Sequence, residues 1–278
     1  MDLNAADFDV IAKIAYRESG LQLVKEKSSM IQSRLRHRVN ALGLESFGSY
    51  TNLISSDNGR TELRHMISAL TTNVSHFFRE KHHFDIFETK IVPGLREKMK
   101  NGEKVRIWSA GCSNGQEGYS IAMVLLNKIP DVASFDVKIL GTDIDPNVVE
   151  FARKADYPER LTDGIPEELL KKFFARSQAG TENQFSAGDA LRELVSFKEL
   201  NLLADWPMKQ KFDVIFCRNV VIYFDLETQN KLWPRFLGAL KADGHIFLGH
   251  SERIIDNEAV GFLTDGPTTY RPKTNRTN

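Results

Sequence analysis

Four apolar segments of strand type alternate with helical segments in the second part of the chain. They read KVRIWSA, DVKILGTDI, KFDVIFCRN and GHIFLGHS, and helical patterns lie between them at about residues 116–127, after Pro146 and at about residues 226–240. Strands separated by helices are typical of a parallel sheet that helices cover on both faces. We therefore predict an α/β fold with a doubly wound, Rossmann-like sheet.

The first part of the chain has helical signals and almost no strand signal. Helices are predicted up to Gly20, at residues 25–42, from Ser46 to residue 54 and at residues 61–70. We predict a small all-helical N-terminal domain over residues 1–80 and an α/β domain over residues 81–278. The latter opens with a helix that ends near the sequence PGL. The polar residues 176–189 predict a loop or small β excursion.

Charge and composition exclude several classes of protein. Lys plus Arg and Asp plus Glu number 37 each, which argues against bulk nucleic-acid binding. No apolar run approaches the ~20 residues that span a bilayer, and the acidic sequence MDLNAADFDV is not a secretory signal. Cys112 and Cys217 are expected to be reduced thiols. We therefore expect a cytoplasmic protein that neither binds nucleic acid nor inserts into a membrane.

The sequence AGCSNGQE follows the first predicted strand and opens the next helix. Gly111 and Gly115 let the backbone approach a ligand, but they match neither the dinucleotide G-x-G-x-x-G spacing nor a P-loop. Glu117 would repel a phosphate and attract a cation. That suits S-adenosylmethionine (SAM), which has an ammonium, a sulfonium and no phosphate. Alternatively, Glu117 only caps the first helical turn.

Polar residues also follow two later strands, at the edge where open α/β sheets bind ligands. Asp143, in GTDID, could accept hydrogen bonds from both ribose hydroxyls, since Asp145 already fills the role of helix cap. In NLL, Asn201 could bond an adenine edge while a leucine, Leu202, covers its face; alternatively, they are a turn asparagine and a core-edge leucine. Together these features favour a SAM-dependent methyltransferase over a dehydrogenase.

The segment FDVIFCRNVVIYF predicts the acceptor site. Enzymes that methylate amino groups usually have an N-P-P-Y-like tip here, but this strand ends in Arg218 and Asn219, followed by Tyr223. A guanidinium is a matched fork for a carboxylate, which is ionised at neutral pH and needs no general base. Catalysis would then largely align an acceptor oxygen with the methyl carbon. Alternatively, Arg218 pairs with an acid at the edge of the core.

A further polar group lies in TTNVSHFFRE, where the two predicted domains join. Asn73, Ser75 and Arg79 stand at a junction of the kind where ligands are often held. They could equally cap and solvate a helix.

Together these segments resemble the chemotaxis receptor methyltransferase family, CheR. The resemblance spans nearly the whole chain and rests on TTNVSHFFRE, RIWSAGCSNGQEGYS, GTDID, NLL, FDVIFCRNVVIYFD and LKADGHIFLGHSE, in family order. It implies a SAM-binding α/β domain with a small β subdomain at about residues 176–195. It also implies transfer of a methyl group, without a metal, to glutamate side chains of membrane chemoreceptors. The products are glutamyl methyl esters, formed in chemotactic adaptation, and S-adenosylhomocysteine, and the enzyme is recruited to receptor arrays.

The resemblance also implies roles for residues at matching positions. Those that would line the cofactor are Asn73, Ser75, Arg79, Glu117, Asp143, Asn201, Leu202, Arg218 and Asn219. Arg79, Arg218 and Tyr223 would be catalytic, near the transferring methyl group and the substrate glutamate.

The sequence departs from the family pattern at three places. Ser75 stands where threonine is common and keeps the hydroxyl group. NGQEGYS stands where TGEEPYS is usual, so Gln116 and Gly118 predict a more flexible turn that still binds the cofactor. Members that tether to a receptor's C-terminal pentapeptide have a G-x-G-x-x-x-G turn in the β subdomain. This region has Gly180 and Gly188 only, which argues against pentapeptide tethering.

Receptor contact and two rival functions stay open. The second predicted helix, from Lys25 to Arg38, is rich in basic residues; such a run is usually a solvated face, but it could steer the acidic methylation helices of a receptor. His82 and His83 diverge on a helix, so no metal site is predicted. The rival functions are a nucleic-acid methyltransferase and a non-catalytic module that senses SAM and binds a receptor.

Overall fold

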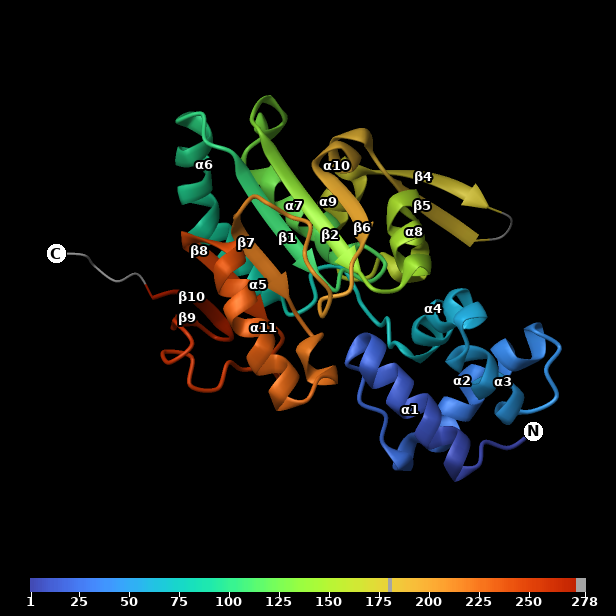
Figure 1. The fold of residues 1–278 in the computed structure, drawn as a ribbon. Coiled ribbons are helices and arrows are strands. Elements are labelled where there is room, and N and C mark those ends of the chain that lie inside the picture. Colours follow the sequence, from blue (N-terminus) through green and yellow to red (C-terminus); the bar gives the residue numbers. More distant parts are fainter. Residues whose placement is uncertain (180–181, 274–278) are drawn as a thin grey trace.

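A computed structural model describes residues 1–179 and 182–273, and Figure 1 shows its two parts. A helical domain (blue to cyan) lies next to the carboxyl ends of the central strands of a larger α/β domain. The helical domain consists of α1 (Ala5–Ser19), α2 (Ser28–Ala41), α3 (Phe47–Ser55) and α4 (Arg60–Leu70), with 3₁₀ turns at Lys25–Lys27 and Asp57–Gly59. Gly20 ends α1 with a left-handed backbone, and Ser46 caps α3 by accepting from the N–H of Ser49.

The first helix of the α/β domain continues past the point where the sequence predicted its end. α5 (Lys81–Ile86) passes through a π-helical turn (Phe87–Ile91) into α6 (Val92–Lys100). Pro93 lies in the first turn of α6, where its missing N–H removes no hydrogen bond that α6 needs. The predicted helix end near PGL was therefore wrong.

The central sheet has the strand order β6-β2-β1-β7-β8-β10-β9. β1 (Val105–Ala110), β2 (Val137–Asp143), β6 (Val195–Glu199), β7 (Phe212–Cys217) and β8 (Leu240–Leu248) run parallel to their neighbours. β9 (Phe262–Gly266) and β10 (Thr269–Pro272) form an antiparallel edge. The predicted doubly wound α/β fold is confirmed, and β6, β9 and β10 are additions to the predicted strands.

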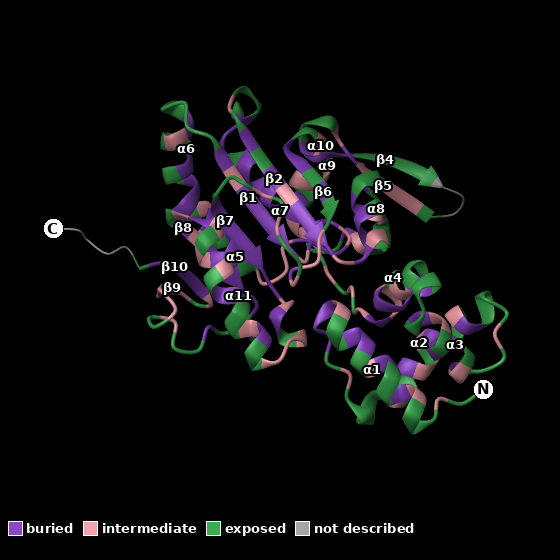
Figure 2. Cartoon of the chain, in the orientation of Figure 1, coloured by how far each residue is buried: buried purple, intermediate pink, exposed green. Residues whose placement is uncertain are grey.

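Helices cover both faces of this sheet, whose central strands β1, β2 and β7 are largely buried (Figure 2). They are α5 and α6 with the π-helical turn between them, α7 (Gln116–Lys128), α8 (Pro146–Lys154), α10 (Asp189–Leu194) and α11 (Leu226–Ala239). There are also 3₁₀ turns at Val132–Ser134, Glu159–Leu161 and Val221–Tyr223. Successive strand residues face opposite sides. Ile107 packs in the core with α5–α7, and Trp108 packs in the core with α11. The carboxyl ends of the strands stay clear of these layers.

A small antiparallel sheet accounts for the polar segment. Its strands, in the order β3-β5-β4, are β3 (Asp156–Pro158), β4 (Phe174–Ala179) and β5 (Glu182–Ala187), with α9 (Glu167–Phe173) before β4. The predicted range 176–195 contains only part of this sheet, because β3 precedes it and α10 occupies residues 189–194. Gly188 lies just before α10, and Gly180 lies outside the described residues.

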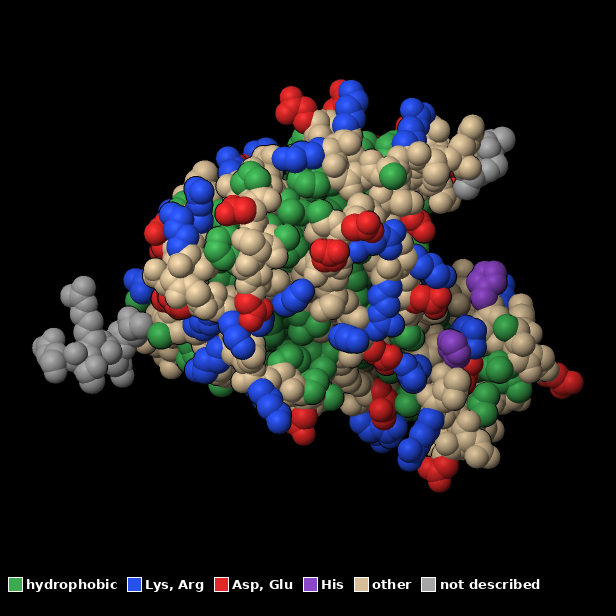
Figure 3. Space-filling view, turned by 90° about the horizontal axis from the view of Figure 1, so that it is seen from above, with side chains coloured by type: hydrophobic (Ala, Val, Ile, Leu, Met, Phe, Trp, Pro, Cys, Tyr) green, Lys and Arg blue, Asp and Glu red, His purple; other side chains and the backbone are tan. Residues whose placement is uncertain are grey.

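The surface matches the even charge balance of the sequence. Basic and acidic side chains are interspersed over the face seen in Figure 3. Among the described helices, none has the length and apolar character to cross a membrane.

Candidate active site

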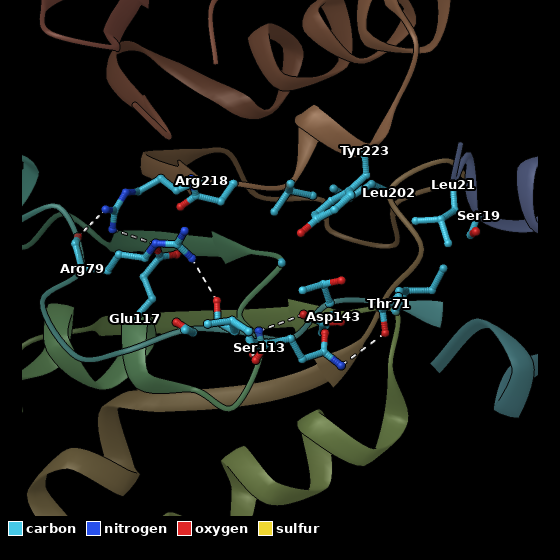
Figure 4. Close-up of a pocket in the computed structure, with 18 of the residues that line it drawn as sticks. Ser19, Leu21, Thr71, Arg79, Ser113, Glu117, Asp143, Leu202, Arg218 and Tyr223 are labelled. Atoms are coloured by element: carbon cyan, nitrogen blue, oxygen red, sulfur yellow. Dashed lines mark hydrogen bonds and ion pairs between the residues drawn. The ribbon is translucent and has the colours of Figure 1, made fainter. Parts of the chain in front are cut away.

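A cavity lies at the carboxyl ends of β1, β2 and β7, against the N-terminal domain (Figure 4). Arg79 and Glu117 lie at one end of it and Ser19 and Leu21 at the other, with Asp143 and Tyr223 between them. Every residue to which the sequence assigned a site role lines this cavity: Asn73, Ser75, Arg79, Glu117, Asp143, Asn201, Leu202, Arg218, Asn219 and Tyr223. Their individual roles toward cofactor and acceptor stay predictions.

The glycine turn after β1 brings strand ends together. Gly111 and Gly115 have φ angles of 81° and 83°, which favour glycine. A Cβ atom on Gly111 would lie 2.3 Å from Cγ2 of Val220, so the glycine lets this turn touch the turn that follows β7. The backbone N–H of Ser113 donates to Oδ2 of Asp143 at 2.8 Å and links the turn to β2.

The same turn is poorly suited to a phosphate. The N–H groups of Gly111 and Cys112 both donate to the carbonyl oxygen of Thr142, at 2.7 and 2.8 Å. With Ser113 bound to Asp143, three successive amides that could cradle a phosphate are engaged within the protein. Carboxylates face the cavity instead, which fits a cationic ligand without phosphate.

Arg218 is the centre of a buried ion-pair network. Its side chain is 2% exposed, with Nη1 3.2 Å from Oε2 of Glu117 and Nη2 3.1 Å from Oε2 of Glu80. Burial raises the pKa of Glu117 against the opposing charge of Arg218. Burial favours a higher pKa for Glu80 as well. A hydrogen bond from His250 and the charge of Arg218 outweigh this effect, and the pKa of Glu80 is lowered to about 2. In this network, the carboxylates of Glu80 and Glu117 share the single guanidinium of Arg218.

These contacts bear on the expectation that Arg218 binds the carboxylate of the acceptor, which stays a prediction. Both terminal nitrogens have partners in the protein, since Nη2 also donates to the backbone oxygen of Arg79, whereas Nε has no partner among the described residues. The alternative that the sequence left open, an arginine paired with acids at the edge of the core, describes what the structure shows. Glu80 follows Arg79 directly in the chain, but nothing in its pattern marked it as the partner of Arg218.

Asp143 lies at the tip of β2 with both carboxylate oxygens oriented by backbone N–H groups. Oδ2 accepts from Ser113 and Oδ1 accepts from Asp145, at 2.8 and 3.0 Å. Each oxygen keeps a further lone pair for a ligand hydroxyl. Burial raises the pKa of Asp143 to about 6 although these hydrogen bonds oppose it. Asp145 caps α8, as predicted, by accepting from the N–H of Asn147.

Asn201 and Leu202 follow β6 and face the N-terminal domain as well as the cavity. Nδ2 of Asn201 donates to the carbonyl oxygen of Glu18 at 2.7 Å, and its Oδ1 accepts from the N–H of Leu203. The side chain of Asn201 therefore stabilises its own turn and contacts the N-terminal domain, so the alternative of a turn asparagine also describes it. Leu202 is 7% exposed and joins the core beside α11.

The junction segment forms one wall of the cavity. Nδ2 of Asn73 donates to Oδ2 of Asp145 at 2.7 Å, and its carbonyl oxygen accepts from the hydroxyl of Ser113. Nη1 of Arg79 donates to the carbonyl oxygen of Val74 at 2.9 Å. Ser75 lines the cavity between them.

The acceptor-side turn follows β7. Asn219 has a left-handed φ of 59°, which asparagine tolerates better than most residues. Tyr223 is half-buried, packs against the N-terminal core, and accepts at its carbonyl oxygen from the N–H of Gln22 at 3.3 Å. The turn thus lies between the sheet and the N-terminal domain.

Some lining residues were not predicted from the sequence, among them Ser19, Leu21, His76 and Ser113. Ser19 and Leu21 flank the glycine that ends α1, so only the packing of the two domains could reveal them. A separate group, Glu80, His82 and His83, has ligand atoms within 4.8 Å of one another. Since Glu80 already binds Arg218 and His250, a metal ion there would have to displace both.

Two family models match the chain. They are "CheR methyltransferase, all-alpha domain" over residues 6–71 and "CheR methyltransferase, SAM binding domain" over residues 73–267. The chain belongs to the CheR methyltransferase family. The cofactor of its α/β domain is therefore S-adenosylmethionine, as the residues at the strand ends predicted.

Curated relatives agree with this family over nearly the full chain. A "Probable chemotaxis protein methyltransferase" of Rhizobium etli is 44% identical, with 92% of this chain and 96% of that protein covered. The "Chemotaxis protein methyltransferase" of Borreliella burgdorferi is 40% identical, covering 94% and 92%, and that of Escherichia coli is 38% identical, covering 96% and 91%. The CheR resemblance read from the motifs is thereby confirmed.

Proposed function

We propose that the protein transfers the methyl group of S-adenosylmethionine to glutamate side-chain carboxylates of chemoreceptors, forming methyl esters. The observation that carries this is a cavity with carboxylates at the ends of β1 and β2 and a glycine turn whose amides are engaged within the protein. Such a site suits a cationic, phosphate-free cofactor. Membership of the CheR methyltransferase family supports the receptor as substrate.

On the cofactor side, the chain provides acceptors and an apolar cover. The bound cofactor supplies a methyl group on positively charged sulfur. Asp143 accepts from the ribose hydroxyls, and Glu117, held by Ser109 and Arg218, offers a carboxylate to the cationic part of the ligand. Leu202 covers the adenine face and Asn219 closes the pocket on the β7 side. Asn73 and Ser75 line its N-terminal wall.

On the acceptor side, Arg79 takes the role first expected of Arg218. Both arginines line the cavity, but the guanidinium of Arg79 donates to Val74 through Nη1, whereas that of Arg218 is held between Glu80 and Glu117. Arg79 then binds the acceptor carboxylate, and Tyr223 lines the route by which that carboxylate enters the cavity. Because that carboxylate is already ionised, alignment rather than proton removal drives the step. Arg218 contributes by holding Glu117 in place.

The basic stretch from Lys25 to Arg38, which consists of a 3₁₀ turn and most of α2, offers only part of its charge to a receptor. Arg38 is bound to Glu62 through two hydrogen bonds, and Arg34 donates to the last carbonyl oxygens of α4. The exposed side chains of Lys27 and Arg36 remain on the surface. We assign receptor steering to these two and, to a lesser extent, to Lys25, whose Nζ lies 3.2 Å from Oδ1 of Asp9. The hairpin β4–β5 lacks the glycine-rich pattern for tethering a pentapeptide.

Incubation with radiolabelled SAM and chemoreceptor-containing membranes tests the proposal. We expect base-labile label on receptor glutamates, and the loss of that label when Arg79 is replaced by alanine. Label on nucleic acid, or tight SAM binding with no transfer, would contradict the proposed function.

A further inference from the structure

One buried carboxylate holds the turn that carries the acceptor-side residues. Glu252 is 2% exposed and lies in the loop after β8. Its Oε1 accepts from the backbone N–H groups of Val220 and Ile222, at 2.8 and 3.1 Å, and its Oε2 accepts from those of Asn219 and Gly249, at 2.8 and 2.6 Å. Three of these four donors belong to the turn between Arg218 and Tyr223.

The sequence of this turn explains why it needs such a partner. A proline-rich tip at this position fixes its own φ angles and has few N–H groups to satisfy. The tip here reads RNVVIYF, without proline, and Asn219 has the unfavourable φ of 59°. Its free N–H groups need acceptors, and the carboxylate of Glu252 binds three of them at once. The loop after β8 thus provides the restraint that prolines would otherwise give.

The loop is shaped to bring Glu252 to the turn. A Cβ atom on Gly249 would lie 2.8 Å from the backbone nitrogen of Asn219 and 2.9 Å from Oε2 of Glu252, so only glycine permits this approach. On its other side, the loop is fixed by His250, whose Nδ1 lies 2.9 Å from Oε1 of Glu80. Glu80 in turn binds Arg218. The loop therefore contacts both the turn and the ion-pair network.

We propose that Glu252 is a positioning residue for methyl transfer, which holds the turn of residues 219–222 so that Asn219 and Tyr223 face the cofactor and the acceptor. This inference rests on the proposed function. It predicts that loss of the carboxylate lowers the rate of transfer by freeing the turn. The cofactor contacts on β1 and β2 remain in place.

Glu252→Gln is the direct test, because the amide keeps the shape but turns one oxygen into a donor that faces two N–H groups. Gly249→Ala is a second route, since the added methyl group displaces the loop while the carboxylate stays. Asp213→Asn is the control for general destabilisation. Asp213 is also a carboxylate 2% exposed, and it accepts from the backbone N–H of Arg106 and pairs with Lys98 and Lys241 near the opposite end of β7.

Two measurements decide the inference: hydrogen exchange of the amides of residues 219–222, and kcat and KM for receptor methylation. In Glu252→Gln and Gly249→Ala we expect these amides to exchange about tenfold faster or more, and kcat to fall by about tenfold or more. The SAM affinity should fall much less. Asp213→Asn should leave both readouts near the wild-type values.

Unchanged exchange in both variants, or faster exchange with an unchanged kcat, overturns the inference. A decrease of kcat in Asp213→Asn as large as that in Glu252→Gln also overturns it, because general destabilisation would then explain the loss. Wild-type protein that methylates no receptor overturns the proposed function instead. The exchange experiment alone would then decide whether Glu252 holds the turn.

Discussion

The carboxyl group of Asp143 changes its charge in an accessible range of pH, because burial raises its pKa to about 6. Protonation removes the acceptor that we propose for the ribose hydroxyls and weakens the attraction of a cationic cofactor. We therefore expect SAM affinity to be full above about pH 7 and to fall about tenfold toward pH 5, because the ionised fraction decreases below the pKa. Calorimetric titration across this range measures the effect.

Asp143→Asn is the control for this pH dependence. The variant keeps Glu117, whose pKa burial also raises, and the neighbouring carboxylate of Asp145. Its affinity for SAM should be lower and should change less with pH. An equal pH dependence in the variant and the wild type would show that another group is responsible.

Removal of Arg218 should destabilise the fold as well as the site. Arg218→Met leaves the largely buried carboxylates of Glu80 and Glu117 without their cation, and uncompensated buried charges of this kind cost about 3–5 kcal/mol. Urea unfolding measures the loss. Lys231→Met, which breaks the exposed pair with Glu227, should leave the unfolding midpoint unchanged. Similar midpoints for the two variants would mean that Arg218 is not the centre of a buried network.

At the scale of elements, the sequence predicts what depends on local pattern. Gly20 and Ser46 mark helix ends correctly because left-handed caps and side-chain caps are local features. β6 was missed because only Val195 and Phe197 of its five residues are buried, a pattern too short to distinguish from a loop. The helix end near Pro93 was predicted wrongly. The free-energy cost of a proline in a helix depends on the backbone before it, which here is a π-helical turn.

In the candidate site too, local patterns were predictable and contacts between distant segments were not. Strand-end residues such as Asp143 were predictable, because parallel strands bring their carboxyl ends to one edge. The partners of Arg218 were not, since Glu80 and Glu117 reach it from elements far apart in the chain. Ser19 and Leu21 escaped prediction because they reach the cavity only when the two domains pack.

The exposed charge on α2 and in the 3₁₀ turn before it can be tested without disturbing the packing of the helix. Lys27→Glu with Arg36→Glu should raise KM for the receptor by about threefold or more by weakening electrostatic steering, with SAM affinity and melting temperature unchanged. Lys209→Glu with Lys211→Glu is the matched control, because these exposed residues precede β7 at the end of the sheet away from the cavity. An equal rise of KM in both double variants would exclude α2 as the steering surface.

At the scale of the whole molecule, Gly20 sets how closely the two domains approach. Its φ is 72°, and an added Cβ atom would lie 2.8 Å from Leu203 and 3.0 Å from Phe224, both in the α/β domain. Overpacking of this kind costs about 1–3 kcal/mol, so we expect Gly20→Ala to weaken SAM binding by about tenfold. Titration with SAM measures this change.

Gly43→Ala is the control for Gly20→Ala. Gly43 has a similar φ of 66°, but nothing lies within 4 Å of an added Cβ atom. The backbone strain is thus shared, and only the domain contact differs. Should both variants bind SAM equally well, the spacing of the domains would not govern the cavity.

The placement of Ser19 and Leu21 beside the cofactor cavity has a consequence for the modularity of this family. The two family matches meet within the segment that joins the domains, at residues 71 and 73, yet residues on both sides of that boundary line one cavity. An α/β domain combined with a foreign helical domain would lack part of its own wall. We therefore expect that an exchange of the helical domain alone changes the shape of the cavity, because Ser19 and Leu21 would be exchanged with it.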